Sequence, residues 1–152
     1  MSGFFIIPIA PTAQKRPRAC VRGRHAMAYK DKGQRDNEQT IETFLAQHQP
    51  ALPMDGPVLL GVKAFMPIPK SMPRRKAEAA EAGSVRPTSK PDLDNLVKQI
   101  KDCMTRMGYW RDDAQVVGFL ETGKFYSTRP RWEITVGLLD ERVANPWPEV
   151  AA

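Results

Sequence analysis

Acidic side chains and a lysine gather in the middle of this 152-residue sequence, in the segment Lys90-Pro-Asp-Leu-Asp-Asn-Leu-Val-Lys98. In an extended chain, Asp92 and Asp94 would point to the same side, about 6.6 Å apart, whereas in a helix they would diverge by roughly 200°. Pro91 favours an extended residue or the first turn of a helix. The spacing therefore predicts a strand-to-helix junction at which the two carboxylates converge.

Converging carboxylates need a positive charge between them. At a separation of about 5 Å and an effective dielectric constant of about 20, two of them repel by about 3 kcal/mol. Asp113, which follows Asp112 in the sequence, adds a third candidate ligand. These donors are hard oxygens with no His or Cys nearby, so they favour Mg²⁺, with Mn²⁺ as a substitute, over Zn²⁺.

Lys98 and Asp102 continue the polar stripe that starts at Asp94, at intervals of one helical turn. A lysine beside carboxylates and a metal ion can stabilise charge that builds on a phosphoryl group, or handle a proton. A structural interpretation is also open, in which Asp92 or Asp94 caps a helix and the stripe is simply solvated. In that case Asp112-Asp113 is a plain turn.

Other chemistries have less support. His25 and His48 are isolated in the sequence, and we expect surface or packing roles for them. No glycine-rich phosphate loop is present. Asp92 with Glu121 and Lys124 is similar to the PD…(D/E)xK nuclease motif, but two residues separate Glu121 from Lys124 where that motif has one.

The sequence is basic, with 23 Lys and Arg against 17 Asp and Glu and a net charge of +6. This balance favours a polyanionic partner such as nucleic acid. The cations concentrate between residues 15 and 35 and between residues 70 and 90, which predicts an extended phosphate-binding surface. The residues expected to contact DNA are Lys15, Arg16, Arg18, Arg22, Arg24, Arg74, Arg75, Lys76, Lys90 and Lys124.

The two cysteines, Cys20 and Cys103, form no CxxC motif, which fits a reducing compartment. Cys103 falls on an apolar helix face and is expected to be a small core residue. No signal peptide and no membrane-spanning apolar run is recognised. We therefore expect a cytoplasmic protein that does not enter a membrane.

Hydrophobic periodicity predicts a single α+β domain with a mixed β-sheet and two principal helices. Strands are expected at residues 4–9 and 58–66, a basic hairpin across residues 20–29, and a closing hairpin that joins residues 116–126 to 132–138. The helices are expected at residues 31–48 and 93–107, the second one ending at Gly108.

The domain is expected to span residues 1–142, followed by an irregular tail at residues 143–152. Residues 67–91 combine several prolines with basic side chains and a short helix-forming stretch at residues 76–82. A long loop of this kind inside a compact domain predicts a mobile, functional insertion.

The segment Lys90 to Lys98, together with Asp102 and Gly108-Tyr-Trp-Arg-Asp-Asp-Ala-Gln-Val-Val117, resembles the RusA family of Holliday-junction resolvases, which phages and prophages often carry. The shared pattern is DxDN, a lysine four residues after the second aspartate, a helical aspartate, and a DDxQV turn that opens a strand. The resemblance is strongest from Lys90 to Lys124 and looser through the N-terminal third.

The resemblance implies that Asp92, Asp94 and Asp113 bind the catalytic metal and that Lys98 is the essential lysine. Asp102 and Asp112 match positions with a supporting role. It also implies a homodimer, whose two-fold symmetry suits paired symmetric nicks in a four-way DNA junction during recombination and repair. Two alternatives stay open: a broader branched-DNA or flap nuclease with the same site, and a non-catalytic DNA-binding protein on the same scaffold.

Overall fold

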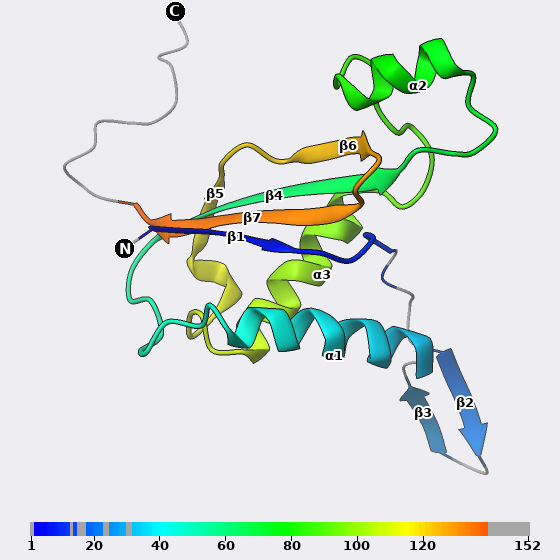
Figure 1. The fold of residues 1–152 in the computed structure, drawn as a ribbon. Helices are drawn as coiled ribbons and strands as arrows, with labels where there is room; N and C mark the ends of the chain where they lie inside the picture. Colours follow the sequence, from blue (N-terminus) through cyan, green and yellow to red (C-terminus); the bar gives the residue numbers. More distant parts are fainter. Residues whose placement is uncertain (1, 13, 15–17, 23–24, 30–31, 140–152) are drawn as a thin grey trace, which may run out of the picture.

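A computed structural model describes residues 2–12, 14, 18–22, 25–29 and 32–139, with the backbone alone for residues 18–22 and 25–29. A β-sheet forms one layer, and helices α1 (Lys32–Ala46) and α3 (Leu93–Arg106) form a second layer across one of its faces (Figure 1). The predicted α+β fold with two principal helices is confirmed.

The sheet is built around strand β4 (Val58–Pro67). On one edge of β4 lies β7 (Arg131–Leu138), which is antiparallel to it and to β1 (Ser2–Ile7). On the other edge lie β5 (Val116–Phe119) and β6 (Gly123–Ser127), both parallel to β4. The sheet is therefore mixed, as predicted, and β1 forms one of its edges and ends just before Pro8.

The predicted closing hairpin is wrong. Strand β6 does not pair with β7, because β4 lies between them and pairs with both. The short loop of residues 128–130 carries the chain across the end of β4 to its opposite edge. The apolar alternation of these segments indicates that they are strands, but it does not indicate which strand each one pairs with. Val62 and Ala64 at the centre of β4 are fully buried, which suits the middle position.

The apolar face of α3 packs against the sheet and α1. Leu96, Ile100 and Met104 have no exposed surface and share one core with Ile41 and Leu45 of α1. Cys103 is also buried, and burial raises the pKa of its thiol to about 12, so it is the inert core residue that was expected. Because this side of α3 is buried, the opposite side, which carries Asp94 and Lys98, is the one that solvent and a ligand can reach.

The polar contacts between α1 and α3 fix how the two helices lie on the sheet. The guanidinium of Arg106 bonds Glu38 at 2.9 Å and Glu42 at 2.7 Å. Beyond the helix end, Gly108 has a positive φ of 73°, and the Tyr109 hydroxyl donates to the carbonyl of Leu45 at 2.7 Å. The glycine at this position confirms the predicted C-terminal cap.

A two-stranded sheet of β2 (Arg18–Arg22) and β3 (His25–Tyr29) confirms the predicted basic hairpin in its backbone. Lys15, Arg16 and Arg24 lie outside the described residues, as does the predicted tail at residues 143–152.

The insertion contains a helix, α2 (Arg74–Glu81), close to the stretch expected from the sequence. Glu81 at its end accepts hydrogen bonds from the Ser127 hydroxyl and the Thr128 amide, so α2 is attached to the end of β6. Figure 1 shows α2 beyond the end of the sheet, apart from α1 and α3. The mobility expected for residues 67–91 stays a prediction.

Candidate active site

Asp92 is the last residue before α3 and has an extended backbone, with φ −69° and ψ 147°. Its carbonyl accepts from the Leu96 amide at 3.2 Å, but its carboxylate makes no capping hydrogen bond. An extended residue at this position was predicted; the strand expected before it was not found, since irregular residues 82–92 connect α2 to α3. Asp92 therefore ends a loop, with its exposed carboxylate free of the helix.

Asp94 lies in the first turn of α3, where the partial positive charge of the helix N-terminus favours a carboxylate. Its side chain is exposed and makes no hydrogen bond or ion pair with any residue that the structure describes. Neither Asp92 nor Asp94 acts as a side-chain cap, so the capping interpretation of these residues is not supported.

The stripe predicted along α3 is present, and its middle is an ion pair. The Lys98 ammonium donates to both carboxylate oxygens of Asp102, at 3.1 and 2.9 Å. Asp102 also accepts from the side-chain amide of Gln14 at 3.3 Å. Asp102 is therefore a partner of Lys98 and a contact for the segment that leads to the basic hairpin.

Asp112 and Asp113 start the short 3₁₀ helix η1 (Asp113–Gln115) that leads into β5. The Asp112 carboxylate accepts from the Ala114 amide at 2.8 Å, while the Gln115 side chain accepts from the Asp112 amide at 3.1 Å, which completes a capping box. Asp112 is thereby used in shaping the turn, and the turn presents Asp113. The Asp113 carboxylate lies 3.7 Å from the Lys101 ammonium.

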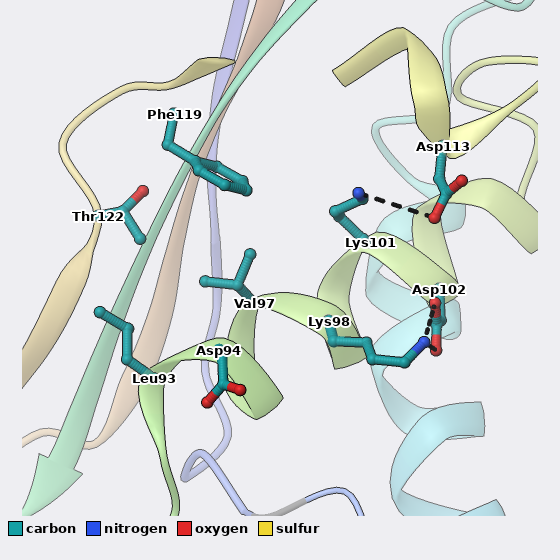
Figure 2. A pocket seen from close by; sticks show the side chains of 9 residues that line it. All are labelled: Leu93, Asp94, Val97, Lys98, Lys101, Asp102, Asp113, Phe119 and Thr122. Carbon is teal, nitrogen blue, oxygen red and sulfur yellow. Dashed lines mark hydrogen bonds and ion pairs between the residues drawn. The ribbon is translucent and has the colours of Figure 1, made fainter. Parts of the chain in front are cut away.

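These charged side chains meet at one cavity of about 600 Å³. Figure 2 shows Asp94, Lys98 and Lys101 along α3, with Asp113 reaching toward the same helix from η1. Helices α3 and η1 thus bring an unpaired carboxylate, two lysines and two lysine-paired carboxylates, Asp102 and Asp113, to one place. Asp92 stands just before this group and does not line the cavity.

The other side of the cavity is apolar. Leu93 and Val97 of α3 face Phe119 of β5 across it, with Thr122 beside them (Figure 2). Phe119 keeps 43% of its surface exposed and Leu93 keeps 36%, so both present apolar surface to the cavity. The cavity can therefore take a ligand that is charged on one side and apolar on the other.

The donor chemistry fits a hard divalent cation, because every candidate ligand is a carboxylate. The ligands are not clustered, however: among the residues that the structure describes, no group of three or more His, Cys, Asp or Glu side chains is close enough to hold one ion. Like charges repel, and a lysine neutralises Asp113. A shared ion would therefore require Asp113 to exchange Lys101 for the metal and to approach Asp94.

The weak PD…(D/E)xK interpretation finds no support in the geometry. Glu121 borders a different cavity, on which Glu133 also lies, and pairs there with Lys63. The hydrogen bond from Lys63 lowers the pKa of the Glu121 carboxyl below its usual value. Lys124 bonds two backbone carbonyls, those of Ser89 and Pro91, at 2.7 and 2.9 Å.

The predicted DNA-contacting residues of the insertion are exposed. Arg75, Lys76 and Lys90 have no ion-pair partner among the described residues, while Arg74 pairs with Glu78 at 3.0 Å. DNA contact by these basic residues stays a prediction.

His48, which was expected to be a packing or surface residue, stacks on Phe5 with ring centroids 4.7 Å apart.

Five residues of the cavity were missed as site residues: Leu93, Val97, Lys101, Phe119 and Thr122. Lys101 could have been found, because it is seven residues after Asp94 and three after Lys98, on the same side of a helix. Phe119 and Thr122 carry no such local signal, since only the pairing of β5 and β6 with β4 brings them beside α3.

Comparison with known proteins relates this chain to a family of DNA endonucleases. A family model described as endodeoxyribonuclease RusA matches residues 8–137. This chain belongs to the RusA endodeoxyribonuclease family, whose known members include Holliday-junction resolvases.

Two relatives illustrate the similarity. An uncharacterized protein of Bacillus subtilis (strain 168), YqaN, is 40% identical over 128 residues, which are 83% of this chain and 89% of that protein. The crossover junction endodeoxyribonuclease rusA of Lactococcus phage r1t is 47% identical over 49 residues, 32% of this chain and 37% of the phage protein. In the part of the chain that the structure describes, no helix is long and apolar enough to cross a membrane.

Proposed function

We propose that this protein is a Mg²⁺-dependent endonuclease, able to use Mn²⁺ instead, that resolves four-way DNA junctions as a homodimer by paired symmetric nicks. The observation that carries the proposal is that Asp94 and Lys98 of α3 and Asp113 of η1 line a single cavity. These are the residues that match the family pattern. The name of the phage relative, a crossover junction endodeoxyribonuclease, supports the choice of substrate.

Asp92, Asp94 and Asp113 are the residues that would hold the metal. A bound Mg²⁺ would polarise a phosphodiester and make water a stronger nucleophile at neutral pH. Asp94 is free to accept a cation, since it has no partner in the described part of the chain. To hold the ion, Asp113 would exchange its lysine for it, and Asp92 would contribute its carboxylate from the end of the loop.

Lys98 would stabilise the negative charge that develops on the scissile phosphate. Its side chain is 63% exposed, so a phosphate can reach the ammonium while Asp102 holds it from the other side. Asp102 acts through Lys98 and is a positioning residue in this scheme. Lys101 adds a second positive charge to the same cavity wall.

The exposed cations of the insertion, together with the basic residues of the hairpin, would bind the phosphates of the junction arms and orient the DNA. Arg75, Lys76 and Lys90 are available for such contacts from the insertion. A homodimer presents the same surface twice, which matches the two-fold symmetry of a junction cut at two equivalent phosphates. The protein would act in the cytoplasm, in recombination or repair, and the phage relative supports a prophage origin.

The test is cleavage of a synthetic four-way junction beside a flap, a fork and a linear duplex of the same sequence, with Mg²⁺, with Mn²⁺ and with EDTA. Paired nicks at symmetric positions, seen only with a divalent cation and only in the junction, are the expected result. Equal cutting of flaps and forks would replace the proposal by a broader branched-DNA nuclease. Tight junction binding with no cutting in either metal would replace it by a non-catalytic DNA-binding protein.

A further inference from the structure

The Lys124 side chain connects the sheet to the loop that leads into the site. From β6 its ammonium donates to the carbonyl of Ser89 at 2.7 Å and to the carbonyl of Pro91 at 2.9 Å. The backbone of Lys124 is held by the central strand of the sheet, since Lys124 of β6 pairs with Ala64 of β4. One side chain thus spans the gap between the sheet and the residues that lead directly into Asp92.

A second basic residue keeps Lys124 in place. Arg86 of the insertion donates to the backbone carbonyl of Lys124 at 3.1 Å and to the carbonyl of Gly83 at 3.0 Å. Its guanidinium lies over the ring of Phe125 at 3.8 Å, and that ring stacks on Phe65 of β4. The loop and β6 are therefore joined in both directions, with the backbone of Lys124 accepting from Arg86 and its side chain donating to Ser89 and Pro91.

Asp92 depends on its backbone for its position. Its carboxylate makes no hydrogen bond or ion pair within the described residues, and residues 82–92 have no regular secondary structure to hold it. Two neighbouring contacts remain: the Asp92 carbonyl accepts from Leu96 of α3, and the Pro91 carbonyl accepts from Lys124. The second of these ties the residue directly before Asp92 to the sheet, and the bonds from Lys124 to Ser89 and from Arg86 to Lys124 hold the loop further back.

We propose that Lys124 is a positioning residue for the metal site: by holding the carbonyls of Ser89 and Pro91, it sets where Asp92 stands relative to Asp94 and Asp113. This inference rests on the proposed role of Asp92 as a metal ligand. It gives Lys124 a role inside the protein in place of the DNA contact expected from its charge. Residues that orient metal ligands typically contribute about 10- to 100-fold to metal affinity.

The test replaces Lys124 by Met, which keeps the length of the side chain and removes its charge and donors. Binding of Mn²⁺ to the full-length protein without DNA is measured by electron paramagnetic resonance, and the Mg²⁺ concentration for half-maximal junction cleavage is measured separately. We expect Lys124→Met to weaken Mn²⁺ binding and raise the Mg²⁺ requirement by about 10- to 100-fold, with junction binding in EDTA unchanged. Lys124→Arg, which can still reach both carbonyls, should recover most of the affinity.

Lys63→Met is the matched control. Lys63 is next to Ala64 on β4, pairs with Glu121 and makes no hydrogen bond or ion pair with residues 82–92 of the described chain. Because Lys63 does not hold the loop, the same chemical change there should leave both metal measurements within about twofold of the unchanged protein. A twofold change corresponds to about 0.4 kcal/mol. A general loss of folding in Lys124→Met would lower its melting temperature; Lys124→Gln, which keeps one donor on a shorter chain, then serves as the second variant.

The outcomes separate this inference from the proposed function. If the unchanged protein cuts junctions and both Lys124→Met and Lys124→Gln bind Mn²⁺ normally, the positioning role is wrong and the proposed nuclease function stands. Weaker junction binding with a smaller salt dependence and normal Mn²⁺ affinity would mean that Lys124 contacts phosphate instead. If the unchanged protein cuts nothing, weakened Mn²⁺ binding in both Lys124→Met and Asp92→Asn would still support the positioning role.

Discussion

The aspartates around the cavity form two pairs that differ in what neutralises them. Asp92 and Asp94, at the start of α3, have no hydrogen-bond or ion-pair partner in the part of the chain that the structure describes. Asp102 and Asp113 each face a lysine of the same helix, at 2.9 and 3.7 Å. We call these the free pair and the lysine-paired aspartates.

The difference shows which carboxylates have a positive counter-charge within the protein and which do not. A carboxylate that already has a lysine adds little demand for an external cation, whereas two free carboxylates near one cavity repel until a cation joins them. Exposed ion pairs contribute about 1 kcal/mol or less to stability, so the lysine-paired aspartates are not required for folding. The free pair is therefore where removal of charge should affect chemistry most and stability least.

The largest effect is expected from Asp94→Asn. This change removes a proposed metal ligand without changing the size of the side chain, so cleavage should fall to background while junction binding in EDTA is retained. Asp92→Asn should behave in the same way. Asp102→Asn is the matched control on the same helix: it breaks an exposed ion pair, and since about 1.36 kcal/mol corresponds to tenfold in rate, the reduction should be at most about tenfold.

Timed cleavage of a labelled junction, with melting curves for each variant, measures all three. Activity of Asp94→Asn within a few-fold of the unchanged protein would overturn the assignment of the free pair. An equal reduction in Asp94→Asn and Asp102→Asn would remove the distinction between the two pairs.

Lys98→Ala should give the next largest effect. If its ammonium stabilises charge on the phosphate, the cleavage rate should fall by about 10²–10³, the scale seen when one such group is removed. Its exposed pair with Asp102 predicts little change in melting temperature. A large drop in melting temperature with a normal rate per folded molecule would instead mean that Lys98 is structural.

Lys101→Met should act in the opposite direction on the metal. Without the lysine, Asp113 resembles the free pair, so Mn²⁺ should bind several-fold more tightly than to the unchanged protein. Calorimetric titration of Mn²⁺ at low ionic strength measures this. Unchanged affinity would show that Asp113 does not exchange Lys101 for the metal, and Asp113 would then leave the proposed ligand set.

The smallest effect on chemistry is expected from the insertion. Replacing Arg74, Arg75 and Lys76 by Ser should weaken junction binding and reduce its log–log salt slope by about 0.9 for each DNA phosphate that is no longer neutralised. Arg86 is kept, because it holds β6 and the ring of Phe125. Mn²⁺ affinity should not change. An identical salt slope in the substituted protein would leave DNA binding to the hairpin alone.

The stripe on α3 could be predicted because a helix turns every 3.6 residues, so the four-residue spacing of Asp94, Lys98 and Asp102 fixes one side. The burial of Leu96, Ile100 and Cys103 on the other side follows from the same rule. The turn at Asp112 also has a local signal, since an aspartate followed three residues later by Gln115 is typical of a capping box.

The contacts between elements could not be predicted in this way. Strand alternation is the same for β6 whether it pairs with β7 or β4, so the closing hairpin was placed wrongly. The Lys101–Asp113 pair joins α3 to η1 and depends on how the chain turns back after Trp110. Lys124 was expected to face DNA, because a sequence shows its charge and not the two carbonyls it meets.

The order of strands has a consequence for how the protein is made. Strand β1 pairs with β7, with Ser2 opposite Gly137. Of the described strands, the first to be synthesised therefore cannot pair until the last has been synthesised. A nascent chain leaves the ribosome with its N-terminus first. Strand β4 therefore also lacks its partner on one side until β7 emerges. Long-range pairing of this kind delays folding until most of the chain is available. Nascent chains cut short before residue 131 should therefore be inactive and sensitive to protease, which would keep the proposed nuclease site from forming on the ribosome.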